Sequence, residues 1–129
     1  MTNARLTIAV VDDDPRLLES LENLLESAGY VVRLFDSAKA TLDSGLANLD
    51  CIITDIGMPN MNGFDLHSAV KRARPELPVF MITGRHEVGD QQRAANSGIA
   101  GLFHKPFDGQ ALLAALERTL GPRKRESET

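Results

Sequence analysis

Side chains able to bind metal ions or phosphate stand at the ends of four short apolar runs of the sequence. Asp12 and Asp13 follow the first run, Asp55 follows the third, Thr83 closes the fourth and Lys105 follows the fifth. In an open parallel sheet, ligands bind outside the carboxyl ends of the strands, where the strand order reverses. If these runs are strands of one such sheet, the sequence predicts a crevice that gathers three carboxylates, a hydroxyl and an ammonium group.

The chemistry predicted for this crevice is binding of a divalent cation and of a phosphate-like anion. Three carboxylates at close range repel one another, so they stay ionised together only when positive charge joins them. Mg²⁺ fits best, because it takes one or two carboxylates, keeps several waters and accepts a phosphoryl oxygen. Lys105 adds a positive charge and Thr83 a hydroxyl donor, which suits a phosphate rather than a carbonyl substrate. Each acid taken alone could instead be a helix cap or a turn residue.

Two hydrophobic periodicities alternate along the chain and predict the elements that position these residues. Short apolar runs rich in β-branched residues are typical of strands buried on both faces, and apolar residues at helical spacing lie between them. Strands are predicted over 6–11, 31–35, 51–54, 79–83 and 102–104, and helices over 15–28, 37–46, 64–74, 88–97 and 108–120. This alternation indicates an α/β fold, a single-domain doubly wound five-stranded parallel sheet with helices on both faces. Asp36, which ends the second strand, is then expected at the sheet edge.

Length, charge and cysteine content restrict the class of protein. The 129 residues suffice for one domain, which we expect over 1–121, followed by a polar tail over 122–129. The net charge of −4 argues against nucleic-acid binding by this domain, and no apolar run approaches the roughly 20 residues of a membrane span. The single cysteine, Cys51, cannot form an internal disulfide, and the first residues lack the pattern of a secretory signal. We therefore expect a cytoplasmic protein with no membrane partner.

The three histidines, His67, His86 and His104, have no spacing typical of metal ligands. We expect structural or solvated roles for them. His104, which stands beside Lys105, is the one placed to tune the predicted site.

Five short motifs, taken in order, resemble the receiver domain of two-component response regulators. The resemblance covers roughly residues 6 to 120, nearly the whole chain. Each motif alone is weak, whereas the ordered set is specific. The motifs are Val10-Val11-Asp12-Asp13-Asp14, Thr54-Asp55-Ile56-Gly57-Met58-Pro59, Asn62-Gly63, Ile82-Thr83-Gly84 and Phe103-His104-Lys105-Pro106-Phe107. The resemblance implies a flavodoxin-like fold with strand order 2-1-3-4-5.

The resemblance implies that Asp55 is a phosphoacceptor. It would take a phosphoryl group from a phosphohistidine of a sensor histidine kinase or of a histidine phosphotransfer protein. Asp12, Asp13, Asp55 and the backbone carbonyl of Gly57 would hold Mg²⁺. Such a protein is a signalling phosphoacceptor rather than an enzyme, because it catalyses only its own phosphorylation and dephosphorylation.

The resemblance also implies a local switch. Thr83 and Lys105 would contact phosphoryl oxygens, and the Lys105–Pro106 peptide bond would be cis. When the phosphoryl group forms, Thr83 would move toward it, and an aromatic residue on the last strand, here Phe103, would follow into the vacated space. The surface altered would be the 88–120 face, where a downstream protein or a second copy of the chain would bind.

Three alternatives compete with this interpretation. A phosphatase of the haloacid-dehalogenase type needs a second Asp two residues after its nucleophile, where this chain has Gly57. A nucleotide-binding protein needs a phosphate-cradling loop such as GxxxxGK[ST], or GxGxxG after the first strand, and neither occurs. An inactive receiver that serves only as a binding module would not need Asp12, Asp13, Asp55, Thr83 and Lys105 together. The sequence leaves open whether the receiver acts alone or was cut from a longer regulator.

Overall fold

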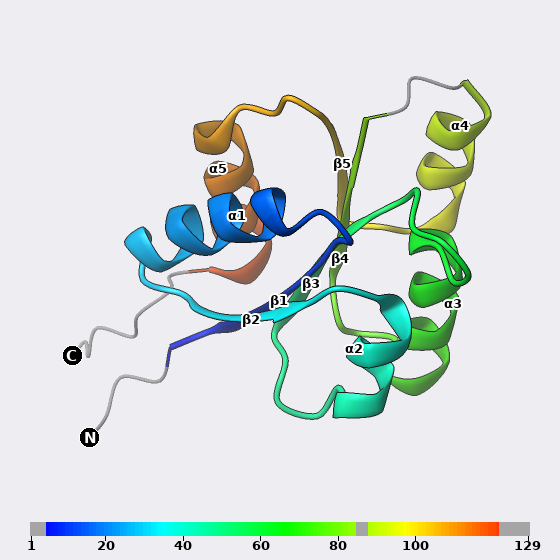
Figure 1. Cartoon of the computed structure of the whole chain (residues 1–129), viewed down its shortest axis with the longest axis horizontal. Coiled ribbons are helices and arrows are strands. Elements are labelled where there is room, and N and C mark those ends of the chain that lie inside the picture. Colours follow the sequence, from blue (N-terminus) through cyan, green and yellow to red (C-terminus); the bar gives the residue numbers. More distant parts are fainter. Residues whose placement is uncertain (1–4, 85–87, 122–129) are drawn as a thin grey trace.

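Five parallel strands form one sheet in the order β2-β1-β3-β4-β5, so the predicted fold class and strand order are confirmed (Figure 1). The computed structural model describes residues 5–84 and 88–121; the predicted tail over 122–129 and His86 lie outside the described residues. No helix within the described residues has the length and apolar character needed to cross a membrane. The elements are β1 (Thr7–Val11), α1 (Pro15–Ser27), β2 (Val31–Phe35), α2 (Ala38–Ser44), β3 (Cys51–Asp55), α3 (Gly63–Ala73), β4 (Val79–Thr83), α4 (Val88–Ser97), β5 (Gly101–His104) and α5 (Gly109–Leu120).

The helices divide into two layers, with α1 and α5 on one face of the sheet and α2, α3 and α4 on the other (Figure 1). Strand β4 shows how its side chains alternate between the layers. Phe80 and Ile82 pack into the core beneath α1 and α5, whereas Met81 packs with Phe64 of α3 and Ala94 of α4. Because successive side chains of a strand point to opposite faces, a residue's place in the alternation determines which helices it contacts.

The central strands are more deeply buried than the two edge strands. Every residue of β3 and β4 is buried, whereas β2 is partly exposed along its length and Asp36, which follows it, is exposed as expected at the sheet edge. A parallel strand covered on both faces needs a continuous apolar run, which is why the sequence identified β3 and β4 readily.

Helix caps fix the loops that leave the carboxyl ends of the strands. After β1, the Asp14 side chain accepts a 2.9 Å hydrogen bond from the Arg16 amide, and Pro15 occupies the first helical position, where no donor is needed. After β3, Asn62 and Asp65 form a reciprocal capping box, with hydrogen bonds of 2.9 and 3.0 Å. These caps hold the chain in place on either side of the candidate site.

Candidate functional site

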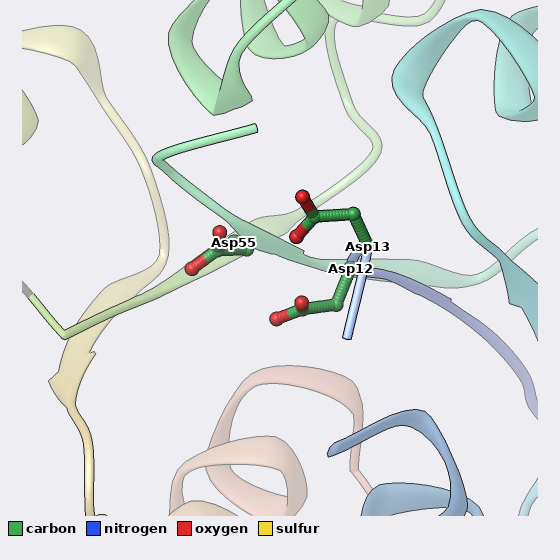
Figure 2. A group of neighbouring side chains, drawn as sticks. All are labelled: Asp12, Asp13 and Asp55. Atoms are coloured by element: carbon green, nitrogen blue, oxygen red, sulfur yellow. The ribbon is translucent and has the colours of Figure 1, made fainter. Parts of the chain in front are cut away.

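Three carboxylates meet at the carboxyl ends of two neighbouring strands. Asp12 and Asp13 follow β1 and Asp55 ends β3, and the two strands are paired with Val11 opposite Thr54. One oxygen from each carboxylate lies within 4.8 Å of the others. Figure 2 shows the side chains of Asp12 and Asp13 extending toward the same side as that of Asp55. The structure therefore brings together the acidic cluster that the sequence predicts.

The ammonium group of Lys105 bridges the two buried acids of this cluster. Its Nζ lies 3.1 Å from Oδ2 of Asp12 and 3.0 Å from Oδ1 of Asp55. Asp12 and Asp55 are 1% and 8% exposed, whereas Asp13 is open to solvent. With three carboxylates and one ammonium group, the formal charge of the cluster is −3 + 1 = −2.

Burial sets the protonation behaviour of Asp12. Desolvation is the largest influence and raises the pKa of Asp12, and the charge of Asp55 raises it further. A 2.8 Å hydrogen bond from the Asp14 amide and the positive charge of Lys105 act in the opposite direction but do not outweigh burial. The buried carboxylate is therefore costly to ionise even with its lysine partner, and additional positive charge at this position would stabilise it.

Lys105 responds in the complementary way. Burial by itself would lower the pKa of the ammonium group, but the hydrogen bond to Asp55 and the charges of both acids outweigh burial, so the pKa of Lys105 is raised. Lys105 thus stays protonated at neutral pH and supplies a fixed positive charge. Its amide donates a 2.8 Å hydrogen bond to the Thr83 carbonyl, which ties the end of β5 to the end of β4.

The donor set fits a hard divalent cation. Carboxylate oxygens are the ligands that Mg²⁺ prefers, and the exposed side of the cluster at Asp13 leaves room for the waters that this ion retains. Gly57 lies two residues after Asp55 in the exposed part of the following loop, and its role as a backbone ligand stays a prediction. The structure therefore provides an acidic pocket suited to a metal ion.

Thr83 and the neighbouring segments lie next to this cluster. Asp55 of β3 pairs with Ile82 of β4, which places Thr83 one residue further along the adjacent strand, where it is 1% exposed. The Lys105–Pro106 peptide bond is cis. A Cβ atom added to Gly84 would stand 3.9 Å from Cδ of Lys105, so the chain after Thr83 runs close to the lysine stem.

Phe103 does not lie where the predicted switch requires it. It pairs with Ile82, packs with the core beneath α1 and α5, and places its ring 6.3 Å from that of Phe80. Successive side chains of a strand point to opposite faces of the sheet. The Thr83 side chain therefore lies on the other face from Ile82, together with Met81. The expectation that Phe103 follows Thr83 into vacated space is therefore corrected, because the two side chains lie on different faces of the sheet.

The residues of β5 on the same face as Thr83 are Leu102 and His104. Leu102 packs with the cluster that contains Met81, and His104 pairs with Thr83 across the two strands. Nε2 of His104 lies 3.4 Å from Nε2 of Gln91 on α4. Sequence reasoning missed Leu102 and Gln91; counting the two-residue alternation from Thr83 across the strand pair would have found Leu102.

Comparison with known proteins agrees with the fold. The sequence profile described as the response regulator receiver domain matches residues 8–117. The chain is 38% identical over 117 residues to the transcriptional regulatory protein FixJ of Azorhizobium caulinodans, covering 90% of this chain and 56% of that protein. It is also 38% identical over 127 residues to the DNA-binding transcriptional regulator NtrC of Rhizobium meliloti, covering 97% of this chain and 26% of that protein. The chain thus spans about half, or less, of the length of these relatives.

Solved structures give the same result. A CheY-like response regulator receiver domain protein from Methanospirillum hungatei superposes with a TM-score of 0.85 at 27% identity, covering 98% of this chain and all of that one. The response regulator StyR superposes with a TM-score of 0.82 at 36% identity, covering 93% of this chain and 61% of that one. With this profile match over most of its length, the chain belongs to the response regulator receiver domain family and is a receiver of phosphorelay signal transduction.

Proposed function

We propose that Asp55 is the residue that receives the phosphoryl group. The observation that carries the proposal is the contact of Lys105 with Asp55, 3.0 Å from Nζ to Oδ1, inside a pocket that also holds Asp12 and Asp13. Asp55 ends the central strand β3, is 8% exposed and has its carboxylate beside those of Asp12 and Asp13. An incoming phosphoryl group would meet a nucleophile whose position is already fixed.

In this proposal, the transfer replaces one bond to phosphorus with another. A carboxylate oxygen of Asp55 attacks the phosphorus of a phosphohistidine on the donor protein. The phosphorus–nitrogen bond breaks, a phosphorus–oxygen bond forms, and the imidazole leaves with the electron pair and takes up a proton. Such reactions depend mainly on alignment and on stabilisation of charge.

The residues around Asp55 would supply that alignment and charge. Lys105 is held between two acids and would pair with a phosphoryl oxygen, and Thr83 at the adjacent strand end would donate its hydroxyl to another. Asp12, Asp13, Asp55 and the carbonyl of Gly57 would hold Mg²⁺. When bound, the ion would neutralise the −2 cluster and shield the negative charge that accumulates during transfer.

The biological role that follows is signalling rather than turnover of a separate substrate. We propose that the donor is a sensor histidine kinase or a histidine phosphotransfer protein, and that the 88–120 face meets a downstream protein or a second copy of the chain. Relatives such as FixJ and NtrC are transcriptional regulators, so the output of the whole regulator would be transcriptional control. Because this chain carries a net negative charge, we do not expect the domain itself to bind nucleic acid.

Intact-mass spectrometry after incubation with Mg²⁺ and a small-molecule phosphodonor tests the proposal. Wild type is expected to gain one phosphoryl group, and Asp55→Asn is expected to gain none. Asp36→Asn is a matched control, because Asp36 also follows a strand but stands exposed after the edge strand β2. If wild type gains no phosphoryl group, the chain is a binding module and the proposal fails. If Asp55→Asn gains as much as wild type, another residue is the acceptor and the proposal fails as well.

A further inference from the structure

A second polar pocket lies on the face of the molecule formed by α3 and α4, which stand side by side (Figure 1). Its volume is about 180 Å³. It shares no residue with the acidic cluster, so it is a separate site. The lining residues come from one stripe of α3 and one stripe of α4: Phe64, His67, Ser68, Lys71, Arg93 and Ser97.

Two positive charges converge on this pocket from different helices. The guanidinium carbon of Arg93 lies 4.3 Å from the centre of the Phe64 ring, which holds the α4 side chain over α3. From α3, the Lys71 side chain reaches toward the end of α4. Its Nζ stands 3.8 Å from the position that a Cβ atom on Gly98 would occupy, and Gly98 directly follows α4. Within residues 5–84 and 88–121, neither Lys71 nor Arg93 forms an ion pair. Both charges are therefore available to a ligand.

A buried histidine also faces the pocket. His67 is only 8% exposed, yet it lines the pocket and forms no hydrogen bond to any other described residue. Burial, and next the charge of Lys71, lower the pKa of His67, so its ring is neutral at pH 7. A neutral imidazole has one N–H to donate. An acceptor bound in the pocket would provide the partner.

The chemistry of the lining selects the ligand. Lys71, Arg93, His67 and the Ser68 hydroxyl offer hydrogen-bond donors, and none of the described residues that line the pocket carries a carboxylate. Arg93 covers the Phe64 ring, so stacking of a nucleobase on that ring is not available. We propose that this pocket binds a small phosphate-class oxyanion, either inorganic phosphate or the phosphate group of a small phosphomonoester. Bound there, the anion would bridge α3 and α4, the helices that follow the strands carrying Asp55 and Thr83.

Nuclear magnetic resonance titration of the whole chain tests this site. Backbone amide shifts are followed in EDTA while inorganic phosphate, glycerol phosphate or acetate is added at constant ionic strength. EDTA removes divalent ions, and the acidic cluster then carries its −2 charge and repels anions. Saturable shifts confined to amides of α3 and α4 are expected with the phosphates and not with acetate. If only inorganic phosphate saturates, the free ion is the ligand; if both phosphates saturate, the site accepts the phosphomonoester group as well.

Charge-removing variants decide whether the binding belongs to this pocket. Lys71→Gln and Arg93→Gln are each expected to weaken phosphate binding about tenfold, the effect of losing one hydrogen bond to a charged group. Arg72→Gln removes the same charge from α3 next to Lys71 but outside the pocket lining, and is expected to stay within about twofold of wild type. Equal weakening in all three variants, no saturation in wild type, or equal binding of acetate would each overturn the proposal.

His67 gives an independent readout in wild type. Burial and then the charge of Lys71 from α3 disfavour the protonated ring, and Arg93 from α4 lines the same pocket. A bound phosphate offsets these charges, so the titration of the His67 ring is expected to move to higher pH when phosphate is present. An unchanged His67 titration at saturating phosphate would contradict the proposed position of the anion. Neither test depends on phosphorylation of Asp55.

Discussion

Gly63 lies directly against the backbone of Asp55. A Cβ atom at residue 63 would stand 2.5 Å from the carbonyl oxygen of Asp55 and 3.0 Å from Cα of Ile56. The Gly63 amide also donates a 3.0 Å hydrogen bond to the Ile56 carbonyl. The first residue of α3 therefore fixes the backbone that carries the proposed phosphoacceptor, and only glycine allows this close an approach.

Gly63→Ala is expected to lower the free energy of unfolding by about 1–3 kcal/mol, because the added methyl group meets backbone that cannot move aside without disturbing β3. It is also expected to slow phosphorylation by a small phosphodonor by about tenfold or more, since Asp55 is displaced from its alignment. Urea unfolding and the rate of mass gain measure the two effects. Gly89→Ala is the control, because no atom of the described residues outside its own helix backbone and chain neighbours lies within 4 Å of its added Cβ. Wild-type phosphorylation rates in Gly63→Ala would show that the contact does not position Asp55.

Lys105→Met is expected to destabilise the protein in the absence of divalent ions. Asp12 and Asp55 would lose the cation that bridges them, which we expect to lower the free energy of unfolding in EDTA by about 1–3 kcal/mol. Added Mg²⁺ should stabilise this variant more than wild type, because the ion no longer competes with the ammonium group for the same oxygens. Urea unfolding with EDTA and with Mg²⁺ checks both statements.

The matched control for Lys105 is Lys39→Met. Lys39 pairs with Asp43 at 2.7 Å, but both side chains are mostly exposed, so its loss should leave the free energy of unfolding close to that of wild type. Equal effects of the two substitutions, or the same Mg²⁺ response in Lys105→Met and wild type, would contradict the bridging role of Lys105.

The strand ends were predictable because burial leaves a plain signal in the sequence. Strands β1, β3 and β4 lie in the middle of the sheet, and their continuous apolar runs end at the polar residues Asp12, Asp55 and Thr83. The reversal of strand order then places these ends at one crevice. The acidic cluster could therefore be placed from the sequence alone.

The face occupied by Phe103 could not be predicted in the same way. Strand β5 has four residues, all partly exposed, so it shows almost no hydrophobic periodicity. The pairing of β5 with β4 determines which face of the sheet each β5 side chain occupies. Ile82 stands opposite Phe103, and Thr83 stands opposite His104. An aromatic residue near Lys105 was visible in the sequence, but this tertiary register was not. The pocket between α3 and α4 was hidden for a similar reason, since it depends on how two helices face each other.

Asp12→Asn is expected to raise the stability of the metal-free protein at pH 7. Because burial raises the pKa of Asp12 above its ordinary value of 3.8, the folded state binds more protons than the unfolded chain between those two values. The free energy of unfolding therefore falls as the pH rises through this window, and the loss is complete above it. The amide of Asn carries no charge and can still accept the hydrogen bond from Asp14. Urea unfolding in EDTA should show the variant more stable than wild type at pH 7, and the difference should shrink toward pH 4.

Mg²⁺ serves as the control for this pH effect. A bound divalent cation favours the ionised carboxylate, so saturating Mg²⁺ at pH 7 should stabilise wild type more than Asp12→Asn. A difference between the two proteins that is the same at pH 4 and pH 7 would mean that titration of Asp12 is not its source.

Phe103→Leu is expected to leave signalling to α4 intact, whereas Leu102→Ala is expected to weaken it. Phe103→Leu removes ring contacts with Phe80 beneath α1 and α5, which should cost about 1 kcal/mol of stability and leave the response of α4 intact. Leu102→Ala removes packing beside Met81 on the face of Thr83, so it should weaken transmission from the site to α4. The measurement is the change in amide shifts of α4 when a beryllofluoride mimic of the phosphoryl group is added. Loss of that change in Phe103→Leu and its retention in Leu102→Ala would restore Phe103 as the switch, because the signal would then pass through the opposite face of the sheet.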